Sequence, residues 1–239
     1  MCTVTLAPLG KNDFVLISNR DEAPSRISTS PDYYKYKNTQ ILYPTDVESG
    51  GTWIGVSKKK RCICLLNGGF EIHERKSSYR HSRGIVVKDL LSCDTILEAV
   101  ENYSLKDIEP FTMVIVDWND ELKFYELVWD GNKKHFEQLI KAPHIWSSST
   151  LYDSAMRTKR KEWFAEFKNK NTINSESLAR FHRTAGQGNQ DYGVIMDRSF
   201  VKTTSITKVE KNGNATEMQY EDLATSKQYS ISLNKVSID

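Results

Sequence analysis

Strand-like segments follow one another in pairs along this chain, and this pairing restricts the possible folds more than any other feature of the sequence. Residues 4–6 and 14–17 are short β-favouring runs separated by turn formers, and residues 52–56 and 62–66 repeat the arrangement. Strands joined by short turns pair antiparallel, whereas a doubly wound parallel sheet needs a helix between successive strands. The pattern therefore predicts an α+β fold built from antiparallel hairpins.

Two blocks of apolar residues at helical spacing interrupt the strands. The block between residues 84 and 103 predicts two short helices, the second capped by Asp94, and the block between residues 153 and 182 predicts a long basic helix followed by a shorter one. The remaining strands are predicted at residues 111–116, 122–128, 136–140, 144–147, 201–209, 217–220 and 229–233. Residues 22 to about 45 lack periodicity and predict an ordered surface loop. No linker or repeat divides the 239 residues, so we expect a single domain over residues 1–239.

Composition and charge exclude several classes of protein. With 33 Lys and Arg against 31 Asp and Glu, the net charge of +2 is not that of a dedicated nucleic-acid binder. Four cysteines are too few for a disulfide-framed secreted protein of this size. We find neither a signal peptide nor an apolar run long enough to span a bilayer, so we expect a cytoplasmic protein without a leader or an integral membrane segment. Its oligomeric state is open.

Cys2 is the residue best suited to act as a nucleophile. If the initiator Met is removed, the chain starts with a thiol and an α-amino group on one residue. Their reference pKa values are about 8.5 and 7.7–8.0, so the amine can serve as the base for the thiol without a separate histidine. The alternative is a small buried cysteine in a first strand, as is common in cytosolic proteins.

The first third of the chain resembles the NRDE family, also called the transport and Golgi organisation protein 2-like family. The residues that carry the resemblance are Met1-Cys2-Thr3, the Asn19-Arg20-Asp21-Glu22 motif that names the family, Arg26, the run Gly50-Gly51-Thr52-Trp53-Ile54-Gly55, Asn67 at a strand end, and Ser82-Arg83-Gly84 at the start of the next helix. They occur in the family's order, which makes the match specific.

The resemblance implies an N-terminal-nucleophile (Ntn) hydrolase fold: a four-layer αββα sandwich of two mainly antiparallel sheets. It also relates the chain to conjugated bile acid hydrolase and penicillin V acylase, in which an N-terminal cysteine attacks a non-peptide amide. Position by position, it assigns catalytic roles to Cys2 as nucleophile, Asp21 and Arg20 as positioning and polarising groups, and Asn67 as an oxyanion-hole donor. For Asn67 the alternative is a simple turn asparagine before Gly68.

Two positions depart from the hydrolase pattern. The relatives place their arginine three residues before the aspartate, where this chain has Ser18, and Arg20 lies only one residue before Asp21. The two spacings have the same parity, so Arg20 is expected on the same strand face, although its reach differs. In place of a second oxyanion asparagine, Ser149 is the closest match, and loss of one oxyanion donor costs roughly 10²–10³ in rate.

Two functional hypotheses follow from the resemblance. The first is an N-terminal cysteine amidohydrolase that cleaves the C–N bond of a small-molecule amide, with Asn19, Arg26, Trp53 and Ser149 in the substrate site. The second is a non-catalytic pocket protein of the same fold that binds or transports haem or a lipid-like ligand, since a fold does not fix a function. The cation of Arg26 and the nearby aromatic residues Tyr33, Tyr34, Tyr36 and Trp53 favour an apolar ligand with a negative charge.

The other candidate groups indicate no further chemistry. Cys62 and Cys64 lie two residues apart in one strand with His73 beyond, which is a poor zinc signature, so we expect buried cysteines and no metal site. His182 falls at a helix end, where the dipole favours a structural role. No sequence feature predicts a cofactor.

Overall fold

This computed structural model describes the backbone of residues 2–233 and the side chains of residues 3–233. A six-stranded sheet has the order β10-β1-β2-β11-β12-β13. Its strands are β10 (His144–Ser147), β1 (Cys2–Leu9), β2 (Asp13–Glu22), β11 (Lys202–Asn212), β12 (Ala215–Asp222) and β13 (Lys227–Ser232). All neighbouring strands in it run antiparallel.

A seven-stranded sheet follows chain order from β3 to β9 and is also antiparallel throughout. Its strands are β3 (Asp32–Tyr36), β4 (Thr39–Tyr43), β5 (Ile54–Ser57), β6 (Arg61–Asn67), β7 (Phe111–Asp117), β8 (Lys123–Trp129) and β9 (Lys134–Leu139). Because each strand pairs with its neighbour in sequence, this sheet forms largely from local hairpins.

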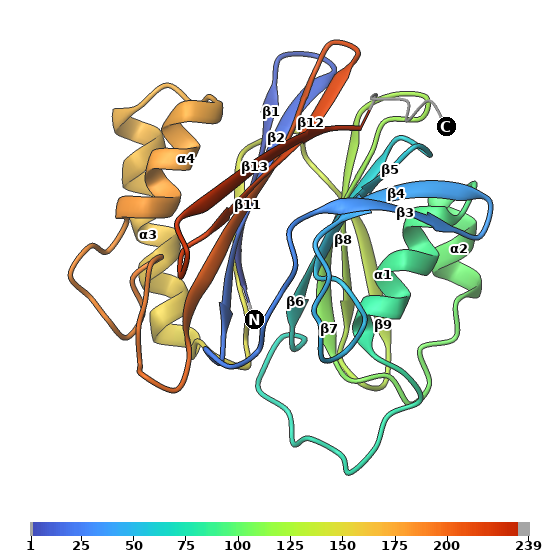
Figure 1. The fold of residues 1–239 in the computed structure, drawn as a ribbon, viewed down its shortest axis with the longest axis horizontal. Helices are drawn as coiled ribbons and strands as arrows, with labels where there is room; N and C mark the ends of the chain where they lie inside the picture. The colour runs from blue at the N-terminus through green and yellow to red at the C-terminus, as the bar shows by residue number, and fades with distance from the viewer. Residues whose placement is uncertain (1, 234–239) are drawn as a thin grey trace.

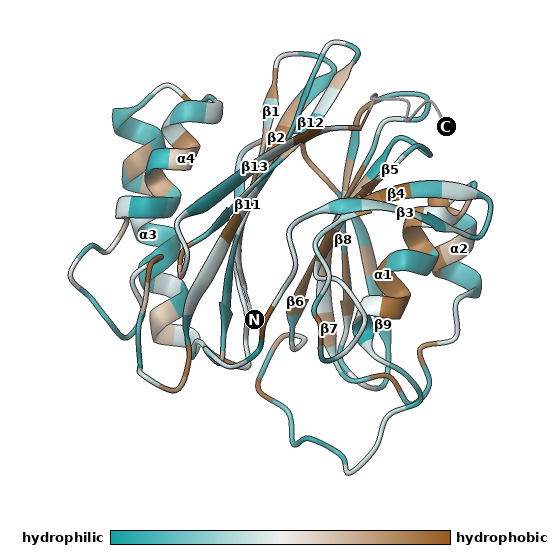
Figure 2. Ribbon diagram, in the orientation of Figure 1, coloured by the Kyte–Doolittle hydropathy of each residue, from teal (hydrophilic) through white to brown (hydrophobic). Residues whose placement is uncertain are grey.

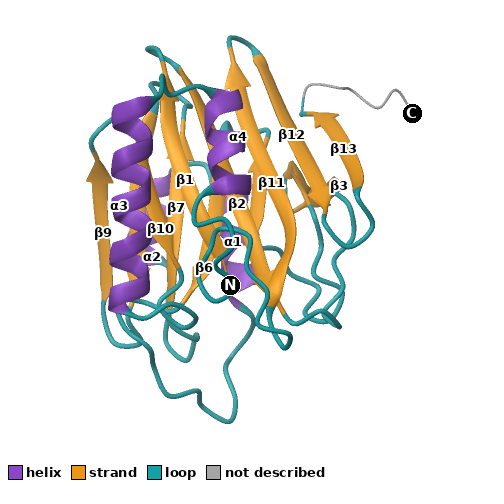
Figure 3. Ribbon diagram, turned by 90° about the vertical axis from the view of Figure 1, so that its left-hand side faces the viewer, coloured by secondary structure: helices purple, strands orange, loops and turns teal. Residues whose placement is uncertain are grey.

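The two sheets face each other, and a pair of helices covers each outer face (Figure 1). α1 (Arg83–Ser92) and α2 (Ile96–Asn102) cover the seven-stranded sheet, and α3 (Ser154–Lys170) and α4 (Ser175–Thr184) cover the six-stranded sheet. Seen from the side of α3 and α4, these helices lie over one part of the sheet and leave β12 and β13 uncovered (Figure 3). The fold is thus the four-layer αββα sandwich of Ntn hydrolases expected from the resemblance.

Three apolar layers fill the spaces between the four layers. Val4 and Leu16 of one sheet meet Val56 and Val114 of the other in the central layer. The outer layers pack strand residues against helix residues such as Leu90 of α1 and Phe164 of α3. In Figure 2 the strands β6, β7 and β8 are largely brown, and α3 and α4 show both teal and brown residues, as helical periodicity requires of helices with one buried face.

Most predicted elements are confirmed, and two expectations are wrong. The segment expected to be a loop contains the β3–β4 hairpin, whose turn places Lys37 at a φ of 50°. The segment has no alternating pattern and no glycine at its turn, so its sequence carries no hairpin signal, and β4 is held in the sheet by pairing with β5. α2 is preceded by Thr95 as N-cap rather than by Asp94, whose carboxylate instead pairs with Lys59.

No helix within the described residues is long and apolar enough to cross a membrane.

Candidate functional site

The end of β2 is polar and buried, and its residues alternate between the two faces of the six-stranded sheet. Arg20 continues the face of Leu16, which belongs to the central apolar layer. Asp21 continues the face of Ile17, which packs under α3 and α4. The motif therefore sends one charged side chain toward the second sheet and the next toward the helices.

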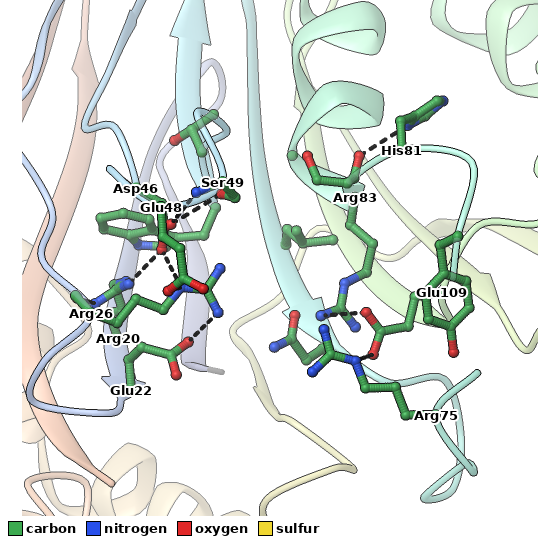
Figure 4. Close-up of a pocket in the computed structure, with 17 residues that line it drawn as sticks. Arg20, Glu22, Arg26, Asp46, Glu48, Ser49, Arg75, His81, Arg83 and Glu109 are labelled. Atoms are coloured by element: carbon green, nitrogen blue, oxygen red, sulfur yellow. Dashed lines mark hydrogen bonds and ion pairs between the residues drawn. The ribbon is translucent and has the colours of Figure 1, made fainter. Parts of the chain in front are cut away.

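A cleft of about 410 Å³ opens beside Arg20 where strands of both sheets end. Its lining is dominated by eight charged side chains: Arg20, Glu22, Arg26, Asp46, Glu48, Arg75, Arg83 and Glu109. They form two groups that face each other across the cleft (Figure 4). We call Arg20, Glu22, Arg26, Asp46 and Glu48 the β2 wall, and Arg75, Ser82, Arg83 and Glu109 the α1 wall.

Arg20 is fixed at the floor of the β2 wall. Its guanidinium is 2.7 Å from the carboxylate of Asp46 and lies 4.8 Å from the ring centroid of Trp53. It also donates to the hydroxyl of Thr204. Burial raises the pKa of Asp46, but the N–H of Ser49 and the guanidinium groups of Arg26 and Arg20 lower it by more than burial raises it. The pKa therefore lies below its usual range, and the carboxylate stays charged.

Arg26 is not the free cation that the sequence suggested. Its guanidinium lies 3.4 Å from Glu22, 2.9 Å from Asp46 and 3.7 Å from Glu48. Its side chain is 33% exposed, so the arginine lines the cleft with its charge already matched by carboxylates. The negative ligand charge that we expected opposite Arg26 therefore has no basis in this arrangement.

The carboxylate of Glu109 holds the α1 wall together. Side-chain nitrogens of Arg83, His73 and Arg75 lie 3.2, 3.5 and 3.8 Å from its oxygens. Arg83 is the first residue of α1. The start of this helix packs closely on the segment that precedes β5: a Cβ on Gly84 would lie 2.8 Å from the backbone nitrogen of Thr52.

Asn67 ends β6 and lines the cleft, and its side-chain amide has no hydrogen-bond partner among the described residues. The hydroxyl of Ser148 donates to its backbone carbonyl at 2.6 Å. Ser149 packs against the next residue, since a Cβ on Gly68 would lie 2.2 Å from its hydroxyl oxygen. The structure thus brings Ser149 and Asn67 to the same strand end, although Ser149 does not line the cleft.

Asp21 is completely buried behind the cleft. Tyr152 and Thr203 each donate a hydrogen bond of 2.7 Å, to different carboxylate oxygens. Burial raises the pKa of Asp21, and Arg160 and the two hydroxyl donors oppose that increase. Burial and the neighbouring carboxylate raise the pKa of Tyr152 well above its usual range, so this phenol keeps its proton and remains a donor.

Arg160 of α3 is the buried cation that faces Asp21, and the sequence analysis missed it. Its side chain is fully buried, and its guanidinium carbon lies 3.6 Å from the ring centroid of Tyr152. It donates to the hydroxyl of Thr3 and to the carbonyls of Tyr192 and Gly193. One side chain therefore connects the start of β1 with the loop after α4.

Asn19 lies outside the cleft. Its amide donates to the carbonyls of His182 and Val194, at 2.9 and 2.7 Å, and its oxygen is 2.8 Å from Nδ1 of His182. Nε2 of His182 is 2.7 Å from the hydroxyl of Thr5. Burial lowers the pKa of His182 to about 3, so this ring is neutral. Its structural role is to link α4 to β1 and β2 by hydrogen bonds, and not to place a charge at the helix end as the sequence suggested.

The side chain of Cys2 lies outside the described residues, but its backbone does not. The register of β1 and β2 pairs Cys2 with Arg20, and Thr3 with Asn19. Cys62 and Cys64 are fully buried in the central layer. The distance that we expected between the Cys2 sulfur and Asn67 remains a prediction.

Several aromatic residues expected at the site lie elsewhere. Tyr34 and Tyr36 pack on the layer beneath α1 and α2, and the hydroxyl of Tyr33 donates to the carbonyl of Ser232. None of the three lines the cleft, and Trp53 does. The aromatic lining that favoured an apolar ligand is therefore reduced to Trp53.

The solved structures that share this architecture include those of a hydrolase, an acylase and an acid amidase ortholog. A variant of conjugated bile acid hydrolase from Clostridium perfringens superposes with a TM-score of 0.64 at 10% identity, over 100% of this chain and 94% of that one. Penicillin V acylase from Agrobacterium tumefaciens gives 0.60 at 11% identity, over 98% and 87%. The Caenorhabditis elegans ortholog of N-acylethanolamine-hydrolyzing acid amidase gives 0.56 at 12% identity, over 87% and 92%. These likenesses define the fold class as that of the Ntn hydrolases.

Within that class, the chain belongs to the Transport and Golgi organisation 2 family, whose model matches residues 1–232. The Bos taurus Transport and Golgi organization protein 2 homolog is 27% identical over 159 residues, which is 63% of this chain and 56% of the bovine protein. The Mus musculus homolog is 33% identical over 92 residues, which is 36% of this chain and 32% of the mouse protein. The matched segments therefore span about half of the bovine relative and about a third of the mouse relative.

Proposed function

We propose that this protein is an N-terminal cysteine amidohydrolase that cleaves the C–N bond of a small-molecule amide. The observation that carries the proposal is the register of β1 and β2, which sets the backbone of Cys2 opposite Arg20. Arg20 lines the same cleft as Asn67. The pairing of the Cys2 backbone with Arg20, together with the Asn67 amide in the same cleft and a fold shared with amidohydrolases, supports this proposal.

In this proposal the initiator Met is removed, and the α-amine of Cys2 takes the thiol proton directly or through a water. The thiolate adds to the carbonyl carbon, and the Asn67 amide donates to the oxyanion. The leaving amine receives the proton from the α-ammonium group, which leaves a thioester on Cys2. Water then hydrolyses the thioester and releases the acid.

Asp21 is suited to orient the α-amine. Tyr152 and Thr203 occupy one lone pair on each carboxylate oxygen, and each oxygen retains another. The guanidinium group of Arg160 lies over the ring of Tyr152 and opposes the effect of burial on the pKa of Asp21. These contacts fix the carboxylate before substrate arrives, which is the condition for efficient positioning.

The test is the mass of the native chain combined with thiol labelling. We expect the mass of a chain without Met1 and faster modification of Cys2 by iodoacetamide than of Cys93, whose thiol pKa is raised by burial. Turnover of a panel of linear amides is expected to disappear in Cys2→Ala and to persist in Cys93→Ala. Retained Met1, or equal labelling of the two thiols, would contradict the proposal.

The same experiments separate hydrolysis from ligand transport. Binding of haem or a fatty acyl compound that is unchanged in Cys2→Ala, with no amide turned over by the native chain, would support a non-catalytic pocket protein instead. Turnover abolished by that substitution would exclude it.

A further inference from the structure

Arg160 contacts three segments that surround Asp21 on the helix-facing side of the six-stranded sheet. Its guanidinium donates to the hydroxyl of Thr3 in β1, to the hydroxyl of Ser147 in β10 at 3.3 Å, and to two carbonyls of the loop between α4 and β11. The side chain is fully buried. Because the planar guanidinium holds its acceptors in fixed directions, Arg160 sets the positions of these segments relative to one another.

The same side chain is connected to Asp21 through Tyr152. The guanidinium carbon lies 3.6 Å from the centroid of the Tyr152 ring, and the Tyr152 hydroxyl donates to Asp21 at 2.7 Å. A second guanidinium, that of Arg198, lies 5.5 Å from the same centroid. Burial raises the pKa of Asp21, and Arg160 is the strongest of the influences that oppose this increase. Arg160 therefore anchors the phenol that holds the carboxylate and favours the charged form of that carboxylate.

The strand that this arginine anchors is the one that begins with Cys2. The register of β1 and β2 pairs Cys2 with Arg20. Because the two strands are antiparallel, the amino end of the Cys2 backbone lies toward Asp21, the residue that follows Arg20. Thr3, which the guanidinium binds, comes directly after Cys2. One buried cation thus contacts the strand beside the proposed nucleophile and, through a phenol ring, the carboxylate proposed to orient its amine.

We propose that Arg160 is a positioning residue for the proposed hydrolysis: it holds the start of β1 in a fixed place relative to the Asp21 carboxylate, so that the α-amine of Cys2 meets a charged acceptor. The proposal rests on the function proposed above, because it gives Arg160 a part in preparing Cys2. Arg160 does not line the cleft, so it acts through other residues and not on the substrate.

This role predicts a pH signature at the Cys2 thiol that a purely structural role does not. A charged Asp21 stabilises the α-ammonium group, and the positive charge of that ammonium favours the thiolate on the same residue. Without the cation of Arg160, the carboxylate takes up a proton more readily and supports the ammonium less. The Cys2 thiolate should then form at a higher pH.

The test follows the alkylation of Cys2 and Cys93 by iodoacetamide against pH in one sample, with the two labelled peptides separated by mass spectrometry. In Arg160→Met we expect the midpoint of Cys2 alkylation to rise by about one pH unit and that of Cys93 to stay unchanged. Arg160→Lys keeps the charge but not the fork, so its Cys2 midpoint should lie between those of the native chain and Arg160→Met.

Tyr152→Phe tests the connection to Asp21 without removing the arginine. It deletes the hydroxyl that donates to the carboxylate and keeps the ring beneath the guanidinium. We expect the Cys2 midpoint to rise in this variant as well. Tyr152→Phe and Arg160→Lys keep the test decisive if Arg160→Met does not fold.

Arg61 supplies a matched control in the other sheet. It is 1% exposed, pairs with Asp117 at 2.7 Å and donates to the sulfur of Cys93 at 3.0 Å. Because Arg61 lowers the pKa of the Cys93 thiol, Arg61→Met should raise the midpoint of Cys93 and leave that of Cys2 unchanged. If Arg61→Met shifts the Cys2 midpoint as much as Arg160→Met does, the positioning role is overturned.

The readouts keep the two proposals separate. If the native chain lacks Met1 and Cys2 reacts faster than Cys93, but the Cys2 midpoint is the same in the native chain and in the Arg160 and Tyr152 variants, the positioning proposal fails and the hydrolase proposal stands. If Met1 is retained, or Cys2 reacts no faster than Cys93, the hydrolase proposal fails and the positioning proposal fails with it.

Discussion

At the scale of single residues, Arg160 is expected to be the most sensitive position outside the cleft. Replacement by Met removes the cation that faces Asp21 and leaves the carbonyls of Tyr192 and Gly193 without their donor. Removing one member of a buried charged network costs about 3–5 kcal/mol. We expect Arg160→Met to lower the free energy of unfolding in urea by this amount.

The neighbouring residue provides the control for that measurement. Lys161 lies on the same helix and is exposed, so Lys161→Met is expected to change stability by less than about 0.5 kcal/mol. Arg160→Lys keeps the charge but loses the fork geometry, and its stability should fall between those of the native chain and Arg160→Met. Equal stabilities of Arg160→Met and the native chain would show that the network is not coupled to folding.

His182 makes stability depend on pH. Its pKa is lowered from 6.5 to about 3 in the folded state, so below pH 6.5 the unfolded chain binds a proton that the folded chain does not. Stability is therefore lost as the pH falls, and this residue alone lowers the free energy of unfolding by about 2 kcal/mol between pH 7 and pH 5. Urea titrations at both values check this, and in His182→Gln the pH dependence should be smaller by that amount. An unchanged dependence would mean that the ring is charged when folded.

The sequence predicted the residues of the site unevenly. The family motif led to Arg20, Asn67 and Trp53, all of which line the cleft. It could not reveal that Arg26 is matched by carboxylates, because Asp46 and Glu48 come from a distant loop. Arg160 did leave a signal, since it occupies the apolar stripe of its helix four residues before Phe164, where a cation needs a buried partner.

At the scale of elements, the turn after β6 depends on a glycine. Gly68 has a φ of 86°, and an added Cβ would lie 2.2 Å from the Ser149 hydroxyl. Gly10 has a φ of 81° and open space around it, so Gly10→Ala measures the backbone strain alone, about 1–2 kcal/mol. We expect Gly68→Ala to be less stable than Gly10→Ala in urea because it adds the steric overlap. Equal losses would show that residues 149–150 move away without cost.

In the β12–β13 turn, introducing a glycine is expected to raise stability. Ser226 is exposed and has a φ of 57°, a conformation that disfavours residues other than glycine. Ser226→Gly is expected to raise the free energy of unfolding by up to about 1 kcal/mol. Thr225 has no such conformation, so Thr225→Gly should lower stability instead. If both substitutions destabilise to the same degree, strain at Ser226 is absent.

Elements with strong local signals were predictable, and those stabilised by neighbours were not. Asp153 was included in the predicted helix start, and its side chain caps α3 by accepting from the N–H of Met156. The β3–β4 hairpin has no Asn-Gly or Gly-Gly turn, and its outer strand β3 is only partly buried. Its existence depends on the edge that β5 provides, a contact that no local window contains.

At the scale of the whole molecule, the layering predicts where hydrogen exchange is slowest. β7 is buried along its full length between the central layer and the layer under α1 and α2, whereas β13 is mostly exposed at an open sheet edge. Exchange monitored by mass spectrometry should be slowest in β6 and β7 and much faster in β13. Similar rates in β7 and β13 would mean that the sandwich opens as one unit.

The hairpin pattern was sufficient for the α+β class, and the family resemblance supplied the four layers. Neither could give the strand order of the six-stranded sheet. That sheet joins β10 to β1 and β2 to β11, pairings across most of the chain that are set by tertiary packing rather than by turns. Long-range pairing of this kind is the part of a fold that local sequence signals specify least.

The contact between Gly84 and the backbone of Thr52 has a consequence for how this site can change. The start of α1, which belongs to the α1 wall, contacts the backbone of the segment that follows Asp46 and Glu48 of the β2 wall. No side chain lies between the helix and this segment. The span between the two charged groups is therefore set by main-chain atoms. Substituting residues along the rim alters charge and hydrogen bonding but leaves that span unchanged. A family member adapted to a longer ligand would need an insertion in the segment before β5, where loop length can vary at low cost.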